Sequence, residues 1–159
     1  MKAKLIIENQ EFDIEILDPE LQQIITPKKT GYEKVADGET YWYVDYCGEV
    51  DENNADWELI DNKLYATANY YSAKEVAINN ARADKLMRQI RRFAAEHDPG
   101  TTKEWIVTWS TSHKALEVHH AGWAQLYGAI YFASYAAANE AIEKFEDELT
   151  WYFTEYQNL

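Results

Sequence analysis

Apolar residues recur along the chain in a pattern that predicts one structural unit used twice. Leu64-Tyr65 recurs as Leu126-Tyr127, 62 positions later, and each leucine is followed after eight positions by a serine, Ser72 or Ser134. After each serine, apolar residues repeat every three or four positions, as on one face of an amphipathic helix, and the two stripes superimpose at the same shift. A β-rich segment followed by one long helix, used twice, is the pattern of a repeated supersecondary unit.

The first unit spans residues 32–98. We expect strands over 32–35 and 41–46 around a turn at Asp37-Gly38, a second turn at Cys47-Gly48, and a strand over 64–71 that enters the helix. Ser72 and Glu75 form a capping-box pattern at the helix start, and Asp98-Pro99-Gly100 ends the helix. The helix is therefore expected to be about 25 residues long, enough to cover a small sheet.

The second unit spans residues 103–156. Its segment 105–109 resembles 42–46 at a shift of 63, and with 115–120 it flanks a turn at 111–113. These segments predict a hairpin, after which 129–132 leads to Ser134 and the final helix.

Residues 1–26 precede the repeated part. Alternating apolar residues predict a β-hairpin over 3–16, and Asp18-Pro19 starts a short helix. Residues 26–31 form a linker. We therefore predict an α+β fold of two tandem strand-then-helix units with an N-terminal hairpin, all in one compact body.

Composition narrows the class of protein. The 159 residues carry a formal net charge of −13 and one cysteine, Cys47, and no apolar run approaches the roughly 18–20 residues of a membrane span. These features favour a cytoplasmic protein. The charge argues against direct nucleic-acid binding, which needs Lys and Arg. It leaves three interpretations open: solubility, capture of a basic partner, or imitation of nucleic acid.

The most unusual local feature is acidic. Between Asp37 and Asp61 there are nine carboxylates and no Lys or Arg. We interpret this stretch either as a solvated hairpin surface or as an electronegative contact surface with Trp57 as its aromatic anchor. The candidate partner-binding residues are Glu49, Asp51, Glu52, Asp56, Trp57, Glu58 and Asp61.

A basic row follows on the first long helix. Its members, spaced three and four residues apart, are Arg82, Lys85, Arg88 and Arg92. The second helix carries Glu140, Glu143 and Asp147 instead. We expect opposite charges from the two helices, or from the acidic stretch, to lie close together; a partner or phosphate contact is the alternative.

No motif in the sequence predicts an enzyme, a metal site or a cofactor. The acidic run from Asp51 to Asp56 lacks the glycine and the distal glutamate of a calcium loop. Glu117 and His119 supply too few ligands for zinc, and Cys47 has no recognisable histidine base. Phosphate-binding loops, dinucleotide fingerprints and serine elbows are absent from the sequence.

Several segments resemble small accessory proteins of Gram-positive phages and prophages. They are residues 4–15, 41–50, 69–75, 128–132 and 149–156, so that the resemblance extends over nearly the whole chain. Length, acidity and this pattern are also similar to the staphylococcal type II anti-CRISPR proteins, which inhibit an RNA-guided Cas nuclease.

The resemblance implies a non-catalytic inhibitor that binds a type II Cas nuclease and holds its nuclease domain away from the cut site. No partner-contacting motif can be transferred residue by residue. The alternatives are a nucleic-acid mimic that blocks DNA binding, and a phage interaction or assembly module, for which a homodimer is an open prediction.

Overall fold

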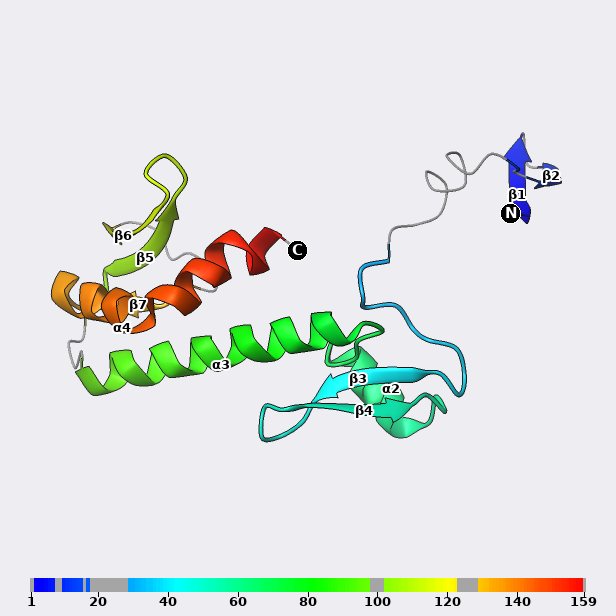
Figure 1. The fold of residues 1–159 in the computed structure, drawn as a ribbon, viewed down its shortest axis with the longest axis horizontal. Helices are drawn as coiled ribbons and strands as arrows, with labels where there is room; N and C mark the ends of the chain where they lie inside the picture. Colours follow the sequence, from blue (N-terminus) through cyan, green and yellow to red (C-terminus); the bar gives the residue numbers. More distant parts are fainter. Residues whose placement is uncertain are drawn as a thin grey trace.

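The computed structural model describes residues 2–7, 10–15, 17, 29–97, 102–122 and 129–158. In this part of the chain, three α-helices and several short antiparallel strands form an α+β fold, as the sequence predicts (Figure 1). In chain order the elements are β1 (Lys2–Ile7), β2 (Gln10–Glu15), β3 (Thr40–Val44), β4 (Val50–Asn54), α2 (Leu59–Ala66), α3 (Lys74–His97), β5 (Trp105–Ser110), β6 (Ala115–His120), β7 (Tyr131–Phe132), α4 (Tyr135–Thr154) and the 3-10 helix η1 (Tyr156–Asn158).

The strands pair in three separate antiparallel groups. β1 pairs with β2, β3 pairs with β4, and the third group has the order β6-β5-β7. The β3–β4 register runs from Thr40 opposite Asn54 to Val44 opposite Val50. Turns join β3 to β4 at 46–48 and β5 to β6 at 111–114, which confirms the turns predicted at Cys47-Gly48 and at 111–113.

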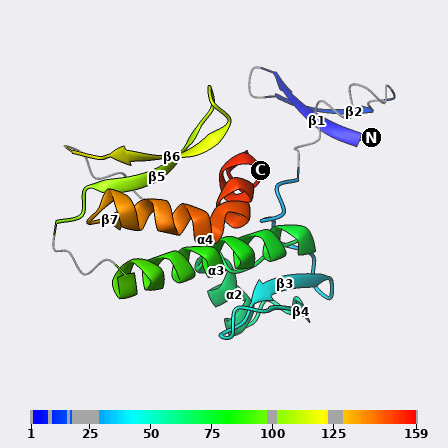
Figure 2. The same cartoon turned by 60° about the vertical axis from the view of Figure 1, so that its left-hand side comes forward.

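Helix α3 is the central element. In both ribbon views, α4 lies along the C-terminal half of α3, while β3, β4 and α2 lie on the opposite side near its start (Figures 1 and 2). The long helix predicted to end before Asp98-Pro99-Gly100 is confirmed as α3. The final helix is confirmed as α4, whose N-cap Ser134 accepts a hydrogen bond from the Ala137 amide at 3.1 Å.

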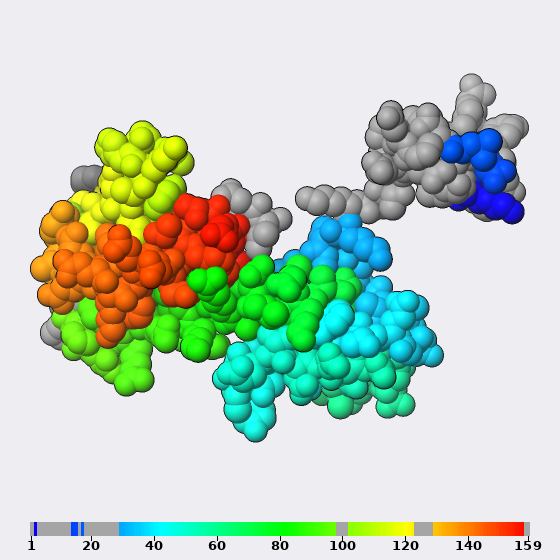
Figure 3. Space-filling model, in the orientation of Figure 1, coloured from blue at the N-terminus to red at the C-terminus, as the bar shows by residue number. Residues whose placement is uncertain are grey.

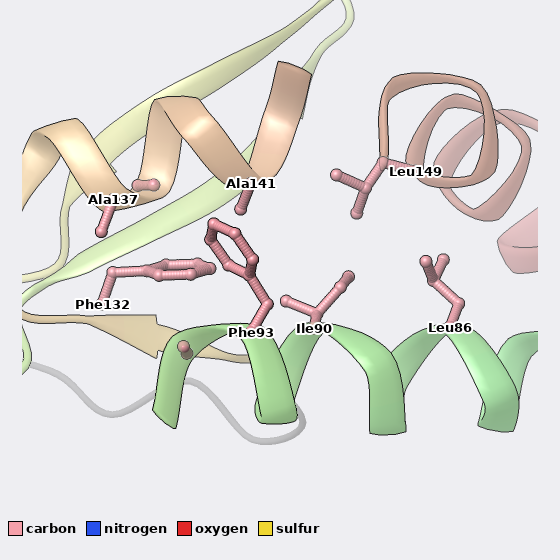
Figure 4. Packing of buried hydrophobic residues seen from close by; sticks show 9 residues of the cluster. Leu86, Ile90, Phe93, Phe132, Ala137, Ala141 and Leu149 are labelled. Carbon is pink, nitrogen blue, oxygen red and sulfur yellow. The ribbon is translucent and has the colours of Figure 1, made fainter. Parts of the chain in front are cut away.

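The main core lies between α3, α4 and the β5 sheet. From α3 come side chains spaced three and four residues apart, and they meet small and aliphatic residues of α4 (Figure 4). The buried members are Leu86, Ile90, Phe93, Ala94, Phe132, Ala137, Ala138, Ala141 and Leu149. The alanines let the α4 backbone approach α3 closely, and Phe132 brings β7 into the same core.

A second, smaller core lies on the other side of the β3–β4 hairpin. Tyr41 and Tyr70 are completely buried and stack with ring centroids 4.2 Å apart. Ala55 completes the buried part, and Trp57 and Leu64 pack against it. This small aromatic core holds α2 against the hairpin.

Part of the strand prediction for the first unit is wrong. Residues 59–66 form helix α2, so the strand predicted over 64–71 is replaced by a helix over its first part. Residues 32–35 form no strand, and the strand that pairs with β3 is β4, in a stretch for which no strand is predicted. The β4 residues are mostly polar, and their extended conformation depends on pairing with β3.

The predicted capping box at Ser72 is also wrong. Helix α3 begins at Lys74, and the Ser72 hydroxyl donates to the carboxylate of Glu33 at 2.9 Å. Glu33 also accepts hydrogen bonds from Thr30 and Gly31. The amide and hydroxyl of Thr30 are the main causes that lower the pKa of Glu33 from 4.5 to about 2. Glu33 therefore ties the segment before β3 to the start of α3.

The two halves of the chain use similar pairings. In the first, Trp42 on β3 forms an antiparallel bridge with Tyr71, shortly before α3. In the second, Trp105 on β5 pairs with Phe132, shortly before α4. The internal repeat and the domain boundaries stay predictions, and the short helix expected near Asp18-Pro19 lies outside the described residues.

Candidate partner-binding surface

One predicted contact residue, Asp61, is buried and cannot belong to a contact surface. Its side chain is 1% exposed, beneath the first turn of α2. One carboxylate oxygen accepts from the Tyr41 hydroxyl at 2.7 Å, and the other accepts from the backbone amides of Asp56 and Trp57 at 2.8 and 2.9 Å. Asp61 therefore holds the loop between β4 and α2 in place through hydrogen bonds to its backbone amides.

The hydrogen bonds keep this buried carboxylate ionised. Burial raises the pKa of Asp61, but the bonds from Tyr41 and from the two amides outweigh it and leave the pKa below the ordinary value of 3.8. Burial, together with the same contact, raises the pKa of Tyr41 to about 12. Tyr41 therefore stays protonated and remains a donor to Asp61.

Trp57 is held by its own molecule. Its backbone has a φ of 54°, which is unusual for a residue other than glycine. Its ring lies 5.4 Å from the ring of Tyr70 and 6.3 Å from that of Tyr65, and the ammonium of Lys34 lies 4.2 Å above it. Trp57 is thus a partly buried member of the small aromatic core and not the free anchor that the sequence suggests.

Three further aspartates of the acidic stretch accept hydrogen bonds from nearby backbone amides. Asp45 accepts from the amides of Cys47 and Glu49, Asp51 from that of Glu52, and Asp56 from that of Glu58, at 2.8–2.9 Å. A short aspartate side chain reaches neighbouring amides in this way and shapes a turn. These carboxylates are exposed except for the half-buried Asp45, but they have local structural roles.

Three glutamates of the same stretch extend into solvent. Glu49, Glu52 and Glu58 are exposed, and their carboxylates form no hydrogen bond or ion pair with the residues that the structure describes. Of the predicted contact residues, these three are the most available to a partner.

The predicted acidic residues do not lie on one face. Asp51 lies opposite Tyr43 and accepts from its hydroxyl at 3.2 Å, on the face of the hairpin that carries the small aromatic core. Glu52 lies opposite Trp42, on the face toward α3. Asp56 and Glu58 lie beyond the end of β4, before α2. The structure therefore divides the predicted surface into a hairpin part and an α2 part.

Two backbone amides on the free edge of β4 are already hydrogen-bonded to side chains. The amide of Asp45 donates to Glu49 and that of Ala55 donates to Glu39, so the odd-numbered residues of β4 form the hydrogen-bonded pairs with β3. The amides of Glu52 and Asn54 therefore point away from β3. Each outward amide donates instead to the side-chain oxygen of the residue before it, Asp51 or Asn53, at 2.8 and 2.9 Å. These two donors are not available to an added strand.

Two exposed aliphatic side chains lie in the α2 part of the predicted surface. Leu59 and Ile60, the first two residues of α2, are each 67% exposed. They are not among the contact residues predicted from the sequence. The signal in the sequence is the adjacent aliphatic pair, Leu59-Ile60, between Glu58 and Asp61 in a stretch otherwise rich in carboxylates.

The basic row of α3 has several partners. Arg82 forms a two-pronged ion pair with Glu148 of α4 at 2.8 and 3.0 Å and stacks over Trp151 at 3.8 Å. Arg92 pairs with Glu96 one turn along α3. The expected neutralisation between the two long helices is thus confirmed for Arg82. Between these two arginines, Lys85 and Arg88 face the β3–β4 turn across a shallow hollow that Glu49 also lines. Figure 3 shows this turn, in cyan, projecting beside α3.

Three of the four histidines lie beside carboxylates. Glu117 lies within hydrogen-bonding distance of both His113 and His119, and His120 lies 2.9 Å from Glu104. Within the described ranges, His, Cys, Asp and Glu form no group of three or more that could hold a metal ion. The helices of the described ranges include none with the length and apolarity to cross a membrane.

Comparison of the chain with protein-family models, with curated proteins and with solved structures finds no match.

Proposed function

We propose that this chain is a phage-encoded inhibitor that binds a type II Cas nuclease through its acidic surface and blocks DNA cleavage. The observation that supports the proposal best is the set of exposed glutamates, Glu49, Glu52 and Glu58, on a hairpin and loop that the aspartates hold in shape. A surface of this kind favours a cationic protein partner.

Cas effectors provide such a partner, because they hold guide and target in positively charged channels. A net charge of −13 accelerates encounter with them by electrostatic steering. In this proposal the inhibitor docks on the nuclease domain and binds its inactive position more tightly than its active one. Equal affinity for the two positions would not shift their populations.

The remaining parts of the proposal follow from this role. The protein acts in the cytoplasm of the bacterial host, as a protein-binding and non-catalytic component, without contacting nucleic acid directly. The two strand-then-helix units are copies of one ancestral unit, and the first copy, with its exposed glutamates, carries the partner contact.

The test is one titration with two readouts. A type II Cas ribonucleoprotein is mixed with increasing amounts of the protein, and DNA cleavage and target binding are measured in the same samples. We expect cleavage to be lost while DNA binding is retained. The charge-reversed variant E49K/E52K/E58K should inhibit at least about tenfold less well, because its exposed carboxylates no longer face a cationic partner.

The other outcomes are distinct. Loss of both cleavage and DNA binding would favour nucleic-acid mimicry. No effect on several type II nucleases would reject the inhibitor and favour a phage interaction or assembly module, which the exposed Leu59 and Ile60 would also suit. Sedimentation at several concentrations would then measure whether that module is a homodimer.

A further inference from the structure

Helix α2 has its polarity reversed at its first turn. The charged residue, Asp61, points inward and is 1% exposed, while the two aliphatic residues before it point outward and are 67% exposed. An amphipathic surface helix normally buries its aliphatic residues and exposes its charges. Packing among the residues that the structure describes gives no reason for the exposure of Leu59 and Ile60.

The reversal is built into the loop and is not a local fraying. Asp61 accepts hydrogen bonds from Tyr41 and from the amides of Asp56 and Trp57, which fixes the rotation of α2 about its axis. Asn62 donates from its side chain to the carbonyls of Trp57 and Glu58 at 2.7 and 3.0 Å. The inward position that an aliphatic residue would take is therefore occupied by a fully hydrogen-bonded carboxylate.

Charged residues surround the aliphatic pair. Asp56 and Glu58 precede it and are exposed, and Lys63 follows it by one turn on the outer side of α2. An apolar centre with polar residues at its rim is the arrangement of a protein contact surface, in which a few buried side chains supply most of the affinity. The acidic side of the rim is complementary to lysine or arginine.

We propose that Leu59 and Ile60 are the apolar anchor that inserts into a hollow on the Cas nuclease, with Lys or Arg of the nuclease facing Asp56 and Glu58. The inference rests on the proposed function and adds the part of the surface that determines affinity. The exposed glutamates accelerate encounter. The aliphatic pair slows dissociation, because the free energy gained by burying it depends on apolar area and not on charge.

The test compares the wild-type chain with the variant L59Q/I60Q in equilibrium binding to an immobilised type II Cas ribonucleoprotein, at low and high salt. Glutamine keeps the helix propensity of α2 and removes the aliphatic surface. The matched control is I78Q on α3, at another exposed isoleucine. We expect L59Q/I60Q to weaken binding by about 30-fold or more at both salt concentrations, and I78Q to leave it unchanged. The melting temperatures of the wild type and L59Q/I60Q should agree, because Leu59 and Ile60 are each 67% exposed.

Three results would overturn the inference. If the wild-type chain binds and L59Q/I60Q binds equally well, the anchor is elsewhere and the proposed function stands. If the wild-type chain does not bind, the proposed function fails and the inference fails with it. If L59Q/I60Q instead converts a wild-type dimer to a monomer in sedimentation, the pair is a self-association surface.

Discussion

The candidate aspartates and the candidate glutamates of the acidic stretch have different roles. Asp51, Asp56 and Asp61 accept backbone amides one to five residues away, whereas Glu49, Glu52 and Glu58 extend into solvent. The longer side chain does not by itself explain the difference, because Glu39 of the same stretch accepts from the Ala36 amide at 2.9 Å; the local backbone conformation decides which carboxylates reach an amide. Charge reversal at the aspartates would therefore alter the loop as well as the surface, and contact residues are best tested at the glutamates.

Asp61 should contribute measurably to stability. We expect D61N to lower the free energy of unfolding by about 2 kcal/mol at neutral pH, because an amide cannot accept from Tyr41 on one side and from two amides on the other. Urea unfolding followed by tryptophan fluorescence measures the loss. The milder variant Y41F removes one of the three bonds and keeps the ring, so its loss should be smaller.

The effect of D61N should depend on pH. Because the pKa of Asp61 is lower in the folded chain than its ordinary value of 3.8, its stabilisation is present well above pH 3.8 and is lost as the pH falls through the folded value. The amide that D61N introduces does not titrate. The difference between wild type and D61N should therefore shrink at about pH 3. An equal difference at both pH values would show that the charge of Asp61 is not what stabilises the loop.

At the scale of whole elements, the two long helices begin differently although a serine precedes both. Ser134 caps α4 by accepting from Ala137, whereas the Ser72 hydroxyl donates to Glu33. We expect S134A to lower the free energy of unfolding by about 1 kcal/mol and to increase amide exchange in the first turn of α4. S134D supplies another capping oxygen and should restore both. If S134D is as unstable as S134A, the cap does not stabilise α4.

This difference also shows how far the sequence predicts the elements. The α3 and α4 helices and the β5–β6 hairpin follow from long, self-contained apolar patterns, and these predictions are confirmed. The start of α3 and the identity of α2 depend on partners far away in sequence. Glu33 accepts a hydrogen bond from the Ser72 hydroxyl, 39 positions away, and Asp61 accepts one from the Tyr41 hydroxyl, 20 positions away.

The candidate surface is predictable only in part for the same reason. Clustered carboxylates mark the stretch, but sequence alone does not separate the buried Asp61 from the exposed Glu58. By hydropathy, Leu59 and Ile60 are residues that α2 would bury. Their exposure follows from the rotation of α2, and that rotation is fixed by the long-range bond to Tyr41.

At the scale of the whole molecule, charge of one sign is spread over several elements. The net charge is −13, with exposed glutamates on the β3–β4 hairpin and others, such as Glu140, Glu143 and Glu146, on α4. Steering by the total charge would treat these groups alike. Recognition at a contact surface would favour the hairpin group, because a charge pair weakens with distance and is screened over about 8 Å at physiological salt.

A pair of charge-matched variants separates the two effects. E49Q/E52Q/E58Q and E140Q/E143Q/E146Q each remove three negative charges. With a type II Cas ribonucleoprotein, we expect the first to lower the association rate constant several-fold more than the second at low salt. At about 1 M salt, where the screening length is about 3 Å, the variants and the wild type should associate at similar rates.

Equal slowing by both variants at low salt would mean that only the total charge steers the protein, and that the acidic hairpin is not part of the contact. A slower hairpin variant whose dissociation rate is unchanged would assign the glutamates to encounter and leave residence time to the apolar pair on α2, because dissociation breaks short-range contacts that distant charges do not reach.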